Sequence, residues 1–322
     1  MNKDRTKGIK TYSVSLGPKT WHKTIVPIML LVMLLGLGGC SRQASAPSNT
    51  DSVKNSEEKV IVTSFYPIYI LSRNICQDVP GVRVLNMTRP QTGCLHDYQL
   101  STEDIKTLEG ASFFVVNGAG AEAFMDKVIQ QQPELRIIEA ARGIRLIKGS
   151  GVQGDNPHVW VSPRLYIKEI ENVSRQLAQA DPENAAKYRS NADIYIKKVA
   201  ILKDQMHQEL DGLPHRNIVT FHEAFPYFAQ EFKLNIVAVI EREPGSAPSA
   251  AELVQTIDIV KKSGARALFA EPQYPVKAAQ SIASETGARV YSLDPGVTGP
   301  DQPDAYIKIM TKNLQTLKEA LR

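Results

Sequence analysis

Three histidines and one aspartate have the types and spacing of a shared metal site. His96, His158, His222 and Asp294 are 62, 64 and 72 residues apart, and each stands where a predicted strand gives way to a loop. In open α/β sheets this edge is where ligands bind. Taken singly, each histidine fits a hydrogen-bonded structural residue better than a metal ligand. With two residues from each of two lobes, however, the four could converge on a cleft between the lobes.

The other histidines carry less information. His22 lies in the predicted leader, while His207 and His215 have polar neighbours in the sequence. Both are therefore predicted to be solvated surface residues.

The first 39 residues have the regions of a secretory leader. Lys19 and Lys23 precede an apolar run from Ile25 to Leu37. Such a run is shorter than the roughly 20 residues that span a bilayer, but it fits the apolar core of a signal peptide. Leu37-Gly38-Gly39-Cys40 resembles a bacterial lipobox, which predicts cleavage before Cys40 and diacylation of that cysteine. An ordinary signal peptide or a short membrane anchor is the alternative.

Composition points to a globular protein with no affinity for nucleic acid. The 322 residues are 43% hydrophobic and 22% charged, and the length favours two domains. The net charge of +4 comes from the leader, because the chain after residue 39 has 32 basic and 33 acidic residues. Residues 40–58 are rich in Ser, Asn, Gln and Glu, as expected for a flexible tether.

After the tether, short β-rich runs alternate with amphipathic segments. This rhythm predicts an α/β fold of two lobes, residues 59–180 and 213–322, each with a mainly parallel four-stranded sheet flanked by helices. The predicted strands are residues 60–65, 82–85, 113–116, 135–138, 218–221, 236–240, 267–270 and 290–293.

One long helix is predicted to join the lobes within residues 181–212. Asp181 is its expected N-cap, Pro182 its first residue, and Gly212 with Pro214 its stop, so residues 182–211 would extend for about 45 Å. A single rigid helix favours a stiff two-lobed body with small closing motions. Its expected buried stripe is Ala186, Tyr188, Ile194, Tyr195, Ile201 and Leu202.

Several segments, in order along the chain, resemble the zinc- and manganese-binding lipoproteins of ABC importers. Those segments are Leu37 to Cys40, Thr63 to Pro67, His96 to Tyr98, Asn156 to Pro163, Phe221 to Phe225, Glu243 to Gly245 with Pro248-Ser249, and Leu293-Asp294. The resemblance implies two α/β lobes, joined by a long rigid helix, that clamp one metal ion between them.

The same resemblance implies the ligand set. The first lobe supplies His96 and His158, and the second supplies His222 and Asp294. Three imidazoles and one carboxylate suit tetrahedral Zn²⁺. Mn²⁺ is the alternative cargo, although it favours more oxygen ligands than this set offers.

Other polar residues near these segments have candidate roles. Asp155, Glu223 and Glu271 are candidates to orient the imidazoles, with solvated acids as the alternative. In an exported protein Cys76 and Cys94 could form a disulfide, worth about 3 kcal/mol in the chain-entropy model. If the pair stays reduced, Cys94 could compete as a soft ligand or be buried, and burial is favoured over ligation. Residues 97–157 contain no histidine, so the His-rich loop of many zinc-importing members is absent from this sequence.

Enzymatic function is not expected. A zinc hydrolase would need an open water position, which three histidines could leave only if Asp294 were not a ligand. His222-Glu223 lacks a second histidine at the helical spacing of metalloproteases, and no G-x-S-x-G occurs. A surface adhesin on the same fold is the other alternative.

The sequence therefore predicts a monomeric, extracytoplasmic receptor, lipid-anchored at Cys40 in the cell membrane. It would capture Zn²⁺ and deliver it to the permease of an ABC importer.

Overall fold

The computed structural model describes residues 58–88, 95, 98–149, 154–240, 248–273 and 275–322. All of these belong to one compact unit, Lys54–Arg322. The predicted leader, Cys40, Cys94 and His96 lie outside the described residues. Within the described ranges, no helix has the length and apolar character needed to cross a membrane.

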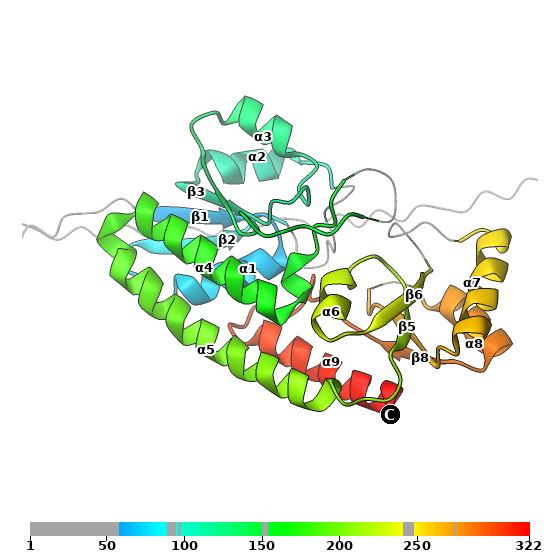
Figure 1. The fold of residues 1–322 in the computed structure, drawn as a ribbon. Coiled ribbons are helices and arrows are strands. Elements are labelled where there is room, and N and C mark those ends of the chain that lie inside the picture. The colour runs from blue at the N-terminus through cyan, green and yellow to red at the C-terminus, as the bar shows by residue number, and fades with distance from the viewer. Residues whose placement is uncertain (1–57, 89–94, 96–97, 150–153, 241–247, 274) are drawn as a thin grey trace, which may run out of the picture. The chain divides into compact units, whose positions relative to one another are not determined.

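The first lobe is built on a parallel sheet with strand order β2-β1-β3-β4 (Figure 1). Its strands are β1 (Lys59–Thr63), β2 (Val82–Asn86), β3 (Phe113–Val116) and β4 (Arg136–Glu139). Its helices are α1 (Tyr66–Ile75), α2 (Thr102–Glu109), α3 (Met125–Gln131) and α4 (Pro163–Ala180). All four residues of the inner strand β3 are buried, as in a parallel sheet covered on both faces.

The second lobe repeats this topology, with strand order β6-β5-β7-β8 and parallel pairing throughout. Its strands are β5 (Asn217–Thr220), β6 (Asn235–Val239), β7 (Ala267–Ala270) and β8 (Arg289–Ser292). Its helices are α6 (Pro226–Glu231), α7 (Ala250–Ser263), α8 (Lys277–Thr286) and α9 (Ala305–Leu321). The predicted α/β class with two four-stranded parallel sheets is confirmed.

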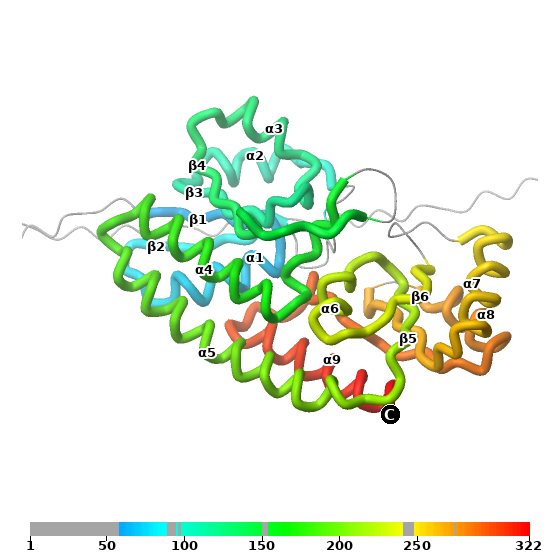
Figure 2. The backbone as a smooth tube through the Cα atoms, in the orientation of Figure 1, coloured from blue at the N-terminus to red at the C-terminus, as the bar shows by residue number. Residues whose placement is uncertain are grey.

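A long helix, α5 (Ala185–Leu210), leads from α4 to β5 (Figure 2). The predicted helix is confirmed, but its first turn differs: Pro182–Asn184 form a 3₁₀ turn, and the 26 residues of α5 span about 39 Å. Asp181 does not cap the helix. Its carboxylate instead accepts hydrogen bonds from Lys59 Nζ (2.7 Å), Asn184 Nδ2 (2.7 Å) and Tyr188 OH (2.8 Å).

The predicted buried stripe of α5 is correct only in part. Tyr188, Tyr195 and Leu202 are buried, because α1, α4 and α9 all pack against this helix. Ala186 is exposed, and Ile194 and Ile201 are 52% and 70% exposed. The last two are seven residues apart, so they share the helix face that points away from the packed neighbours.

The two sheets share one hydrophobic core. Ile218 of β5 belongs to the same buried cluster as Val62 of β1, and the cluster continues through α4, α5 and α9. Val219, the next residue of β5, points to the opposite face and joins a separate cluster under α7 and α8. Strand alternation thus turns one face of the second sheet toward the first lobe.

The segment after β8 is hydrogen-bonded to α1 of the first lobe. Tyr66 OH donates to the carbonyl of Pro300 (2.8 Å), and Asn74 Nδ2 donates to the carbonyl of Pro303 (2.8 Å). Arg73 pairs with Asp301 at 2.6 Å. These polar contacts and the shared hydrophobic core together attach the second lobe to the first.

Candidate metal centre

Two of the candidate histidines face each other across the lobes. His158 immediately precedes a 3₁₀ turn, η1 (Val159–Val161), in the first lobe, and His222 follows β5 in the second. Each residue is only 2% exposed. Their ring centroids are 4.7 Å apart, and the ring planes are inclined at 83°. Strand β5 ends at the carboxyl edge of its sheet, so the topology delivers His222 where ligands bind in such folds.

Asn156 orients His158 and links its segment to that of His222. Its Oδ1 accepts the backbone N–H of His158 (3.0 Å) and lies 3.1 Å from the imidazole Nδ1. Its Nδ2 donates to the carbonyl of Glu223 (2.7 Å), and its own carbonyl accepts from Tyr227 OH (2.6 Å). Asn156 was not among the predicted site residues, and its only signal in the sequence is its position two residues before His158.

Glu271 contacts the second histidine. Its Oε1 lies 3.2 Å from His222 Nδ1, and its other oxygen accepts from Gln273 Nε2 at 2.9 Å. Burial raises the pKa of Glu271 and the contact with His222 opposes that shift. The negative charge of Asp294 raises this pKa further.

Asp294 follows β8 and is fixed by its neighbours. Asn313 of α9 accepts its backbone N–H (2.9 Å) and donates to its carbonyl (2.7 Å). One carboxylate oxygen accepts the N–H of Gly296 at 2.8 Å. Burial raises the pKa of Asp294, while the Gly296 hydrogen bond and the charge of Lys312 oppose the rise.

Trp160 ties the Asp294 loop to the His158 segment. Its indole Nε1 donates to the carbonyl of Pro295 (2.9 Å), the residue after Asp294. Its ring centroid lies 5.2 Å from that of His158 and 5.0 Å from that of Phe65. Trp160 is 1% exposed, so these contacts are held inside the core.

The remaining predicted residues lie elsewhere or outside the described chain. Asp155 pairs with Lys148 at 2.6 Å. Glu223 is half-buried, and a side chain at Gly149 would come within 3.7 Å of its carboxylate. Cys76 is buried, which raises its pKa, and its predicted partner Cys94 lies outside the described residues, so the disulfide stays a prediction.

Within the described residues, no three His, Cys, Asp or Glu side chains gather as a complete metal site. His96 lies outside those residues. The four-ligand set therefore stays a prediction, of which His158 and His222 are in direct ring contact.

The two histidines expected at the surface differ from each other. His215 is half-buried, and its backbone N–H donates to the carbonyl of Leu321 (3.3 Å). The side chain of His207 is 33% exposed, but its ring also packs against Phe232 at 4.8 Å and its Nε2 lies 3.6 Å from the buried carboxylate of Glu231.

Two parallel sheets of identical topology, a long connecting helix and paired histidines between the lobes define the class of metal-binding solute-binding proteins. Residues 61–320 match the profile of the family described as zinc-uptake complex component A, periplasmic. The chain belongs to this family.

Relatives and solved structures agree with this assignment. The high-affinity zinc uptake system protein ZnuA of Bacillus subtilis is 29% identical, over 94% of this chain and 98% of that protein. The zinc-binding lipoprotein AdcA of Streptococcus pneumoniae is 27% identical over 92% of this chain, which spans only 61% of AdcA.

Among solved structures, FpvC of Pseudomonas aeruginosa in complex with Mn²⁺ has a TM-score of 0.75 and 28% identity, covering 82% of this chain and 99% of FpvC. The laminin-binding protein Lmb of Streptococcus agalactiae is described as bifunctional, with adhesin and metal-transporting activity. It has a TM-score of 0.74 and 27% identity, covering 82% of this chain and all of Lmb (100%).

Proposed function

We propose that this protein is a lipid-anchored, extracytoplasmic receptor that captures one Zn²⁺ ion and delivers it to the permease of an ABC importer. The ion is the cargo, and the protein is not an enzyme. The ligands are His96, His158, His222 and Asp294, the anchor is Cys40, and the receptor is a monomer. The observation that carries the proposal is the contact between the buried rings of His158 and His222, which come from different lobes.

The surroundings of the two rings support metal binding. Asn156 Oδ1 can only accept, and the donation of Asn156 Nδ2 to the Glu223 carbonyl fixes which end of the amide faces His158. His158 therefore carries its proton on Nδ1. Glu271 favours the same tautomer of His222. In both rings Nε2 is left as the ligating atom, the arrangement typical of metal-bound histidine.

The donor set also fits a carrier that must release its ion. Neutral imidazoles and a carboxylate bind zinc without thiolate. Mn²⁺ is the alternative cargo, and FpvC, a protein of the same fold, has been seen with that ion. Because imidazoles protonate near pH 6.5, the affinity for zinc should fall at acid pH.

The test is metal stoichiometry of the purified mature protein by elemental analysis, with affinity from competition against a chromophoric chelator. We expect one zinc per chain, and a loss of affinity by orders of magnitude in His158→Ala and Asp294→Ala. His215→Ala is the matched control, since His215 lies outside the candidate site, and it should bind like wild type. Unchanged affinity in His158→Ala would overturn the proposal. Zinc retained by Asp294→Ala together with hydrolytic activity would favour the hydrolase instead.

An adhesin role is a second candidate, favoured by the similarity to Lmb, which is described as having both activities. It predicts binding to immobilised laminin by wild type and equally by His158→Ala. Absence of binding by the wild type would exclude laminin as a partner.

A further inference from the structure

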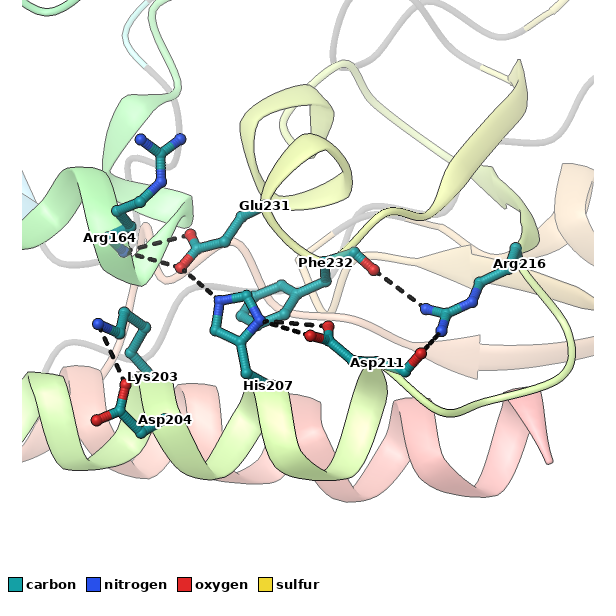
Figure 3. Close-up of polar contacts among 8 residues, drawn as sticks. All are labelled: Arg164, Lys203, Asp204, His207, Asp211, Arg216, Glu231 and Phe232. Atoms are coloured by element: carbon teal, nitrogen blue, oxygen red, sulfur yellow. Dashed lines mark hydrogen bonds and ion pairs between the residues drawn. The ribbon is translucent and has the colours of Figure 1, made fainter.

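A buried carboxylate of the second lobe lies at the N-terminus of a helix in the first lobe. Glu231 is the last residue of α6, and its side chain is 1% exposed. Both of its oxygens accept the backbone N–H of Arg164 at 3.2 Å (Figure 3). Oε2 also accepts a hydrogen bond from the hydroxyl of Ser162. Ser162 is the N-cap of α4.

Glu231 completes the hydrogen bonding of the first turn of α4. Pro163 has no N–H, Ser162 Oγ accepts the N–H of Leu165 (3.2 Å), and Glu231 accepts that of Arg164. A negative charge at this end of a helix also interacts favourably with the helix dipole. Glu231 of the second lobe therefore supplies the acceptor for the backbone N–H of Arg164, one of the N–H groups at a helix N-terminus that have no partner within the helix.

The contact joins the two segments that carry His158 and His222. His158 is followed by η1 and then by Ser162, so the ligand and the cap are four residues apart. His222 is followed by α6, which ends at Glu231. A shift of Glu231 relative to Ser162 would move one imidazole relative to the other.

Arg216 and His207 fix the position of Glu231 at the C-terminal end of α6. Arg216 donates to the carbonyls of Phe232 (3.1 Å) and Asp211, the residues that follow α6 and α5. The ring of His207 in α5 packs against Phe232, with its Nε2 3.6 Å from Glu231 and its Nδ1 3.2 Å from Asp211 (Figure 3). The long helix thus fixes the end of α6 that presents the carboxylate to α4.

We propose that Glu231 is a positioning residue for metal binding, which sets the spacing of His158 and His222 by fastening α6 to the N-terminus of α4. This role rests on the proposed function, in which both histidines bind the ion. Glu231 acts through Ser162 and Arg164 and does not contact the metal.

The test compares Glu231→Gln with Asp181→Asn. Asp181 is a matched control because its side chain is also 1% exposed, but it lies at the other end of α4. Its carboxylate accepts hydrogen bonds from Lys59, Asn184 and Tyr188, none of which belongs to the second lobe. Glu231→Gln keeps the size of the side chain but loses the charge and one acceptor. We expect zinc affinity to fall about tenfold in Glu231→Gln and to be unchanged in Asp181→Asn.

Hydrogen exchange of the metal-free protein gives an independent readout. In Glu231→Gln the amides of Arg164 and Leu165 should exchange about fivefold faster, as expected for a weakened helix cap. Ser162→Ala should lower zinc affinity too, and the double variant should be less impaired than the two separate effects predict, because both residues belong to one contact.

Three outcomes would overturn the positioning role. One is a lowered melting temperature in Glu231→Gln with wild-type zinc affinity, which is what a purely structural carboxylate would give. Another is an equal loss of affinity in Asp181→Asn. Failure of the proposed function is visible separately, as absence of zinc binding by the wild-type protein, and it would overturn this role as well.

Discussion

Asn156 and Glu271 each place an oxygen atom beside the Nδ1 of one imidazole, but the two oxygens differ in charge. Asn156 offers a neutral amide oxygen to His158, whereas Glu271 offers a carboxylate to His222. A carboxylate at Nδ1 raises the basicity of the ring and therefore strengthens its bond to a metal ion. The two proposed ligands are thus unequal, and we expect His222 to bind zinc more strongly than His158.

Glu271→Gln should lower zinc affinity between about tenfold and 100-fold while leaving the fold intact. The amide preserves the shape of the side chain but removes the negative charge that lies 3.2 Å from His222 Nδ1. The measurement is chelator competition at pH 7.5. Asp155→Asn is the matched control, since Asp155 pairs with Lys148 at 2.6 Å and not with an imidazole. Equal affinities of the two variants would contradict the role of Glu271.

Glu122 should make the stability of the metal-free protein depend on pH. Burial raises its pKa to about 7, although Ser64 and the N–H groups of Asn117 and Gly118 donate to it and oppose the shift. Between its ordinary value of 4.5 and about 7, the folded chain holds a proton that the unfolded chain releases. The contribution of Glu122 to the free energy of unfolding is therefore largest below pH 4.5. It declines by about 3 kcal/mol as the pH rises from 4.5 to about 7.

Urea denaturation of the wild type and Glu122→Gln at pH 5 and pH 7.5 checks this expectation. The glutamine variant has no proton to lose at this position, so its stability should fall less between the two pH values. Parallel changes in both proteins would show that Glu122 does not titrate in this range.

At the scale of elements, the loop after β8 depends on a close approach to α1. A Cβ atom at Gly299 would overlap the hydroxyl of Tyr66, which donates to Pro300 at 2.8 Å. The loop begins directly after Ser292 and contains Asp294, so its attachment to the first lobe also positions a predicted ligand.

Gly299→Ala should destabilise the protein by about 1–3 kcal/mol, the usual cost of overpacking a tight contact. Zinc affinity should fall as well, because the loop carries Asp294. Gly212→Ala is the control, since a Cβ at Gly212 meets no atom within 4 Å. Thermal unfolding and zinc titration of the two variants provide the comparison, and a fully stable Gly299→Ala would show that Tyr66 moves aside without cost.

Elements were predictable where a repeating pattern sets them. Buried runs such as Phe113–Val116 gave the strands of both sheets, because parallel strands covered on both faces are continuously apolar. Partners across the fold were not predictable in this way. Asn156 and Asp155 are adjacent in the sequence, yet the backbone turns one toward His158 and the other toward Lys148. Ile201 fits the apolar pattern of a core residue, but within the described part of the chain its side chain is 70% exposed.

At the scale of the whole molecule, the shared core of the two lobes predicts that they unfold as one unit. The main hydrophobic cluster contains residues of both sheets, and Tyr166 of α4 stacks on Tyr306 of α9 with ring centroids 3.8 Å apart. The hydroxyl of Tyr306 donates to the carbonyl of Trp160 at 2.9 Å. Separating the lobes would expose this core, which favours small closing motions over wide opening.

Thermal unfolding should therefore show a single transition that zinc shifts as a whole. An ion that binds only the folded chain, at 100 times its dissociation constant, adds about 2.7 kcal/mol of stability. For a chain of this size that corresponds to a rise of about 4–5 °C in melting temperature. The rise should disappear on addition of a chelator and shrink at pH 5, where the imidazoles bind protons in place of zinc. Calorimetry with and without zinc measures the number of unfolding transitions and the shift of the melting temperature. Two transitions, of which zinc moves only one, would mean that the lobes unfold independently and that the ion is held by one of them.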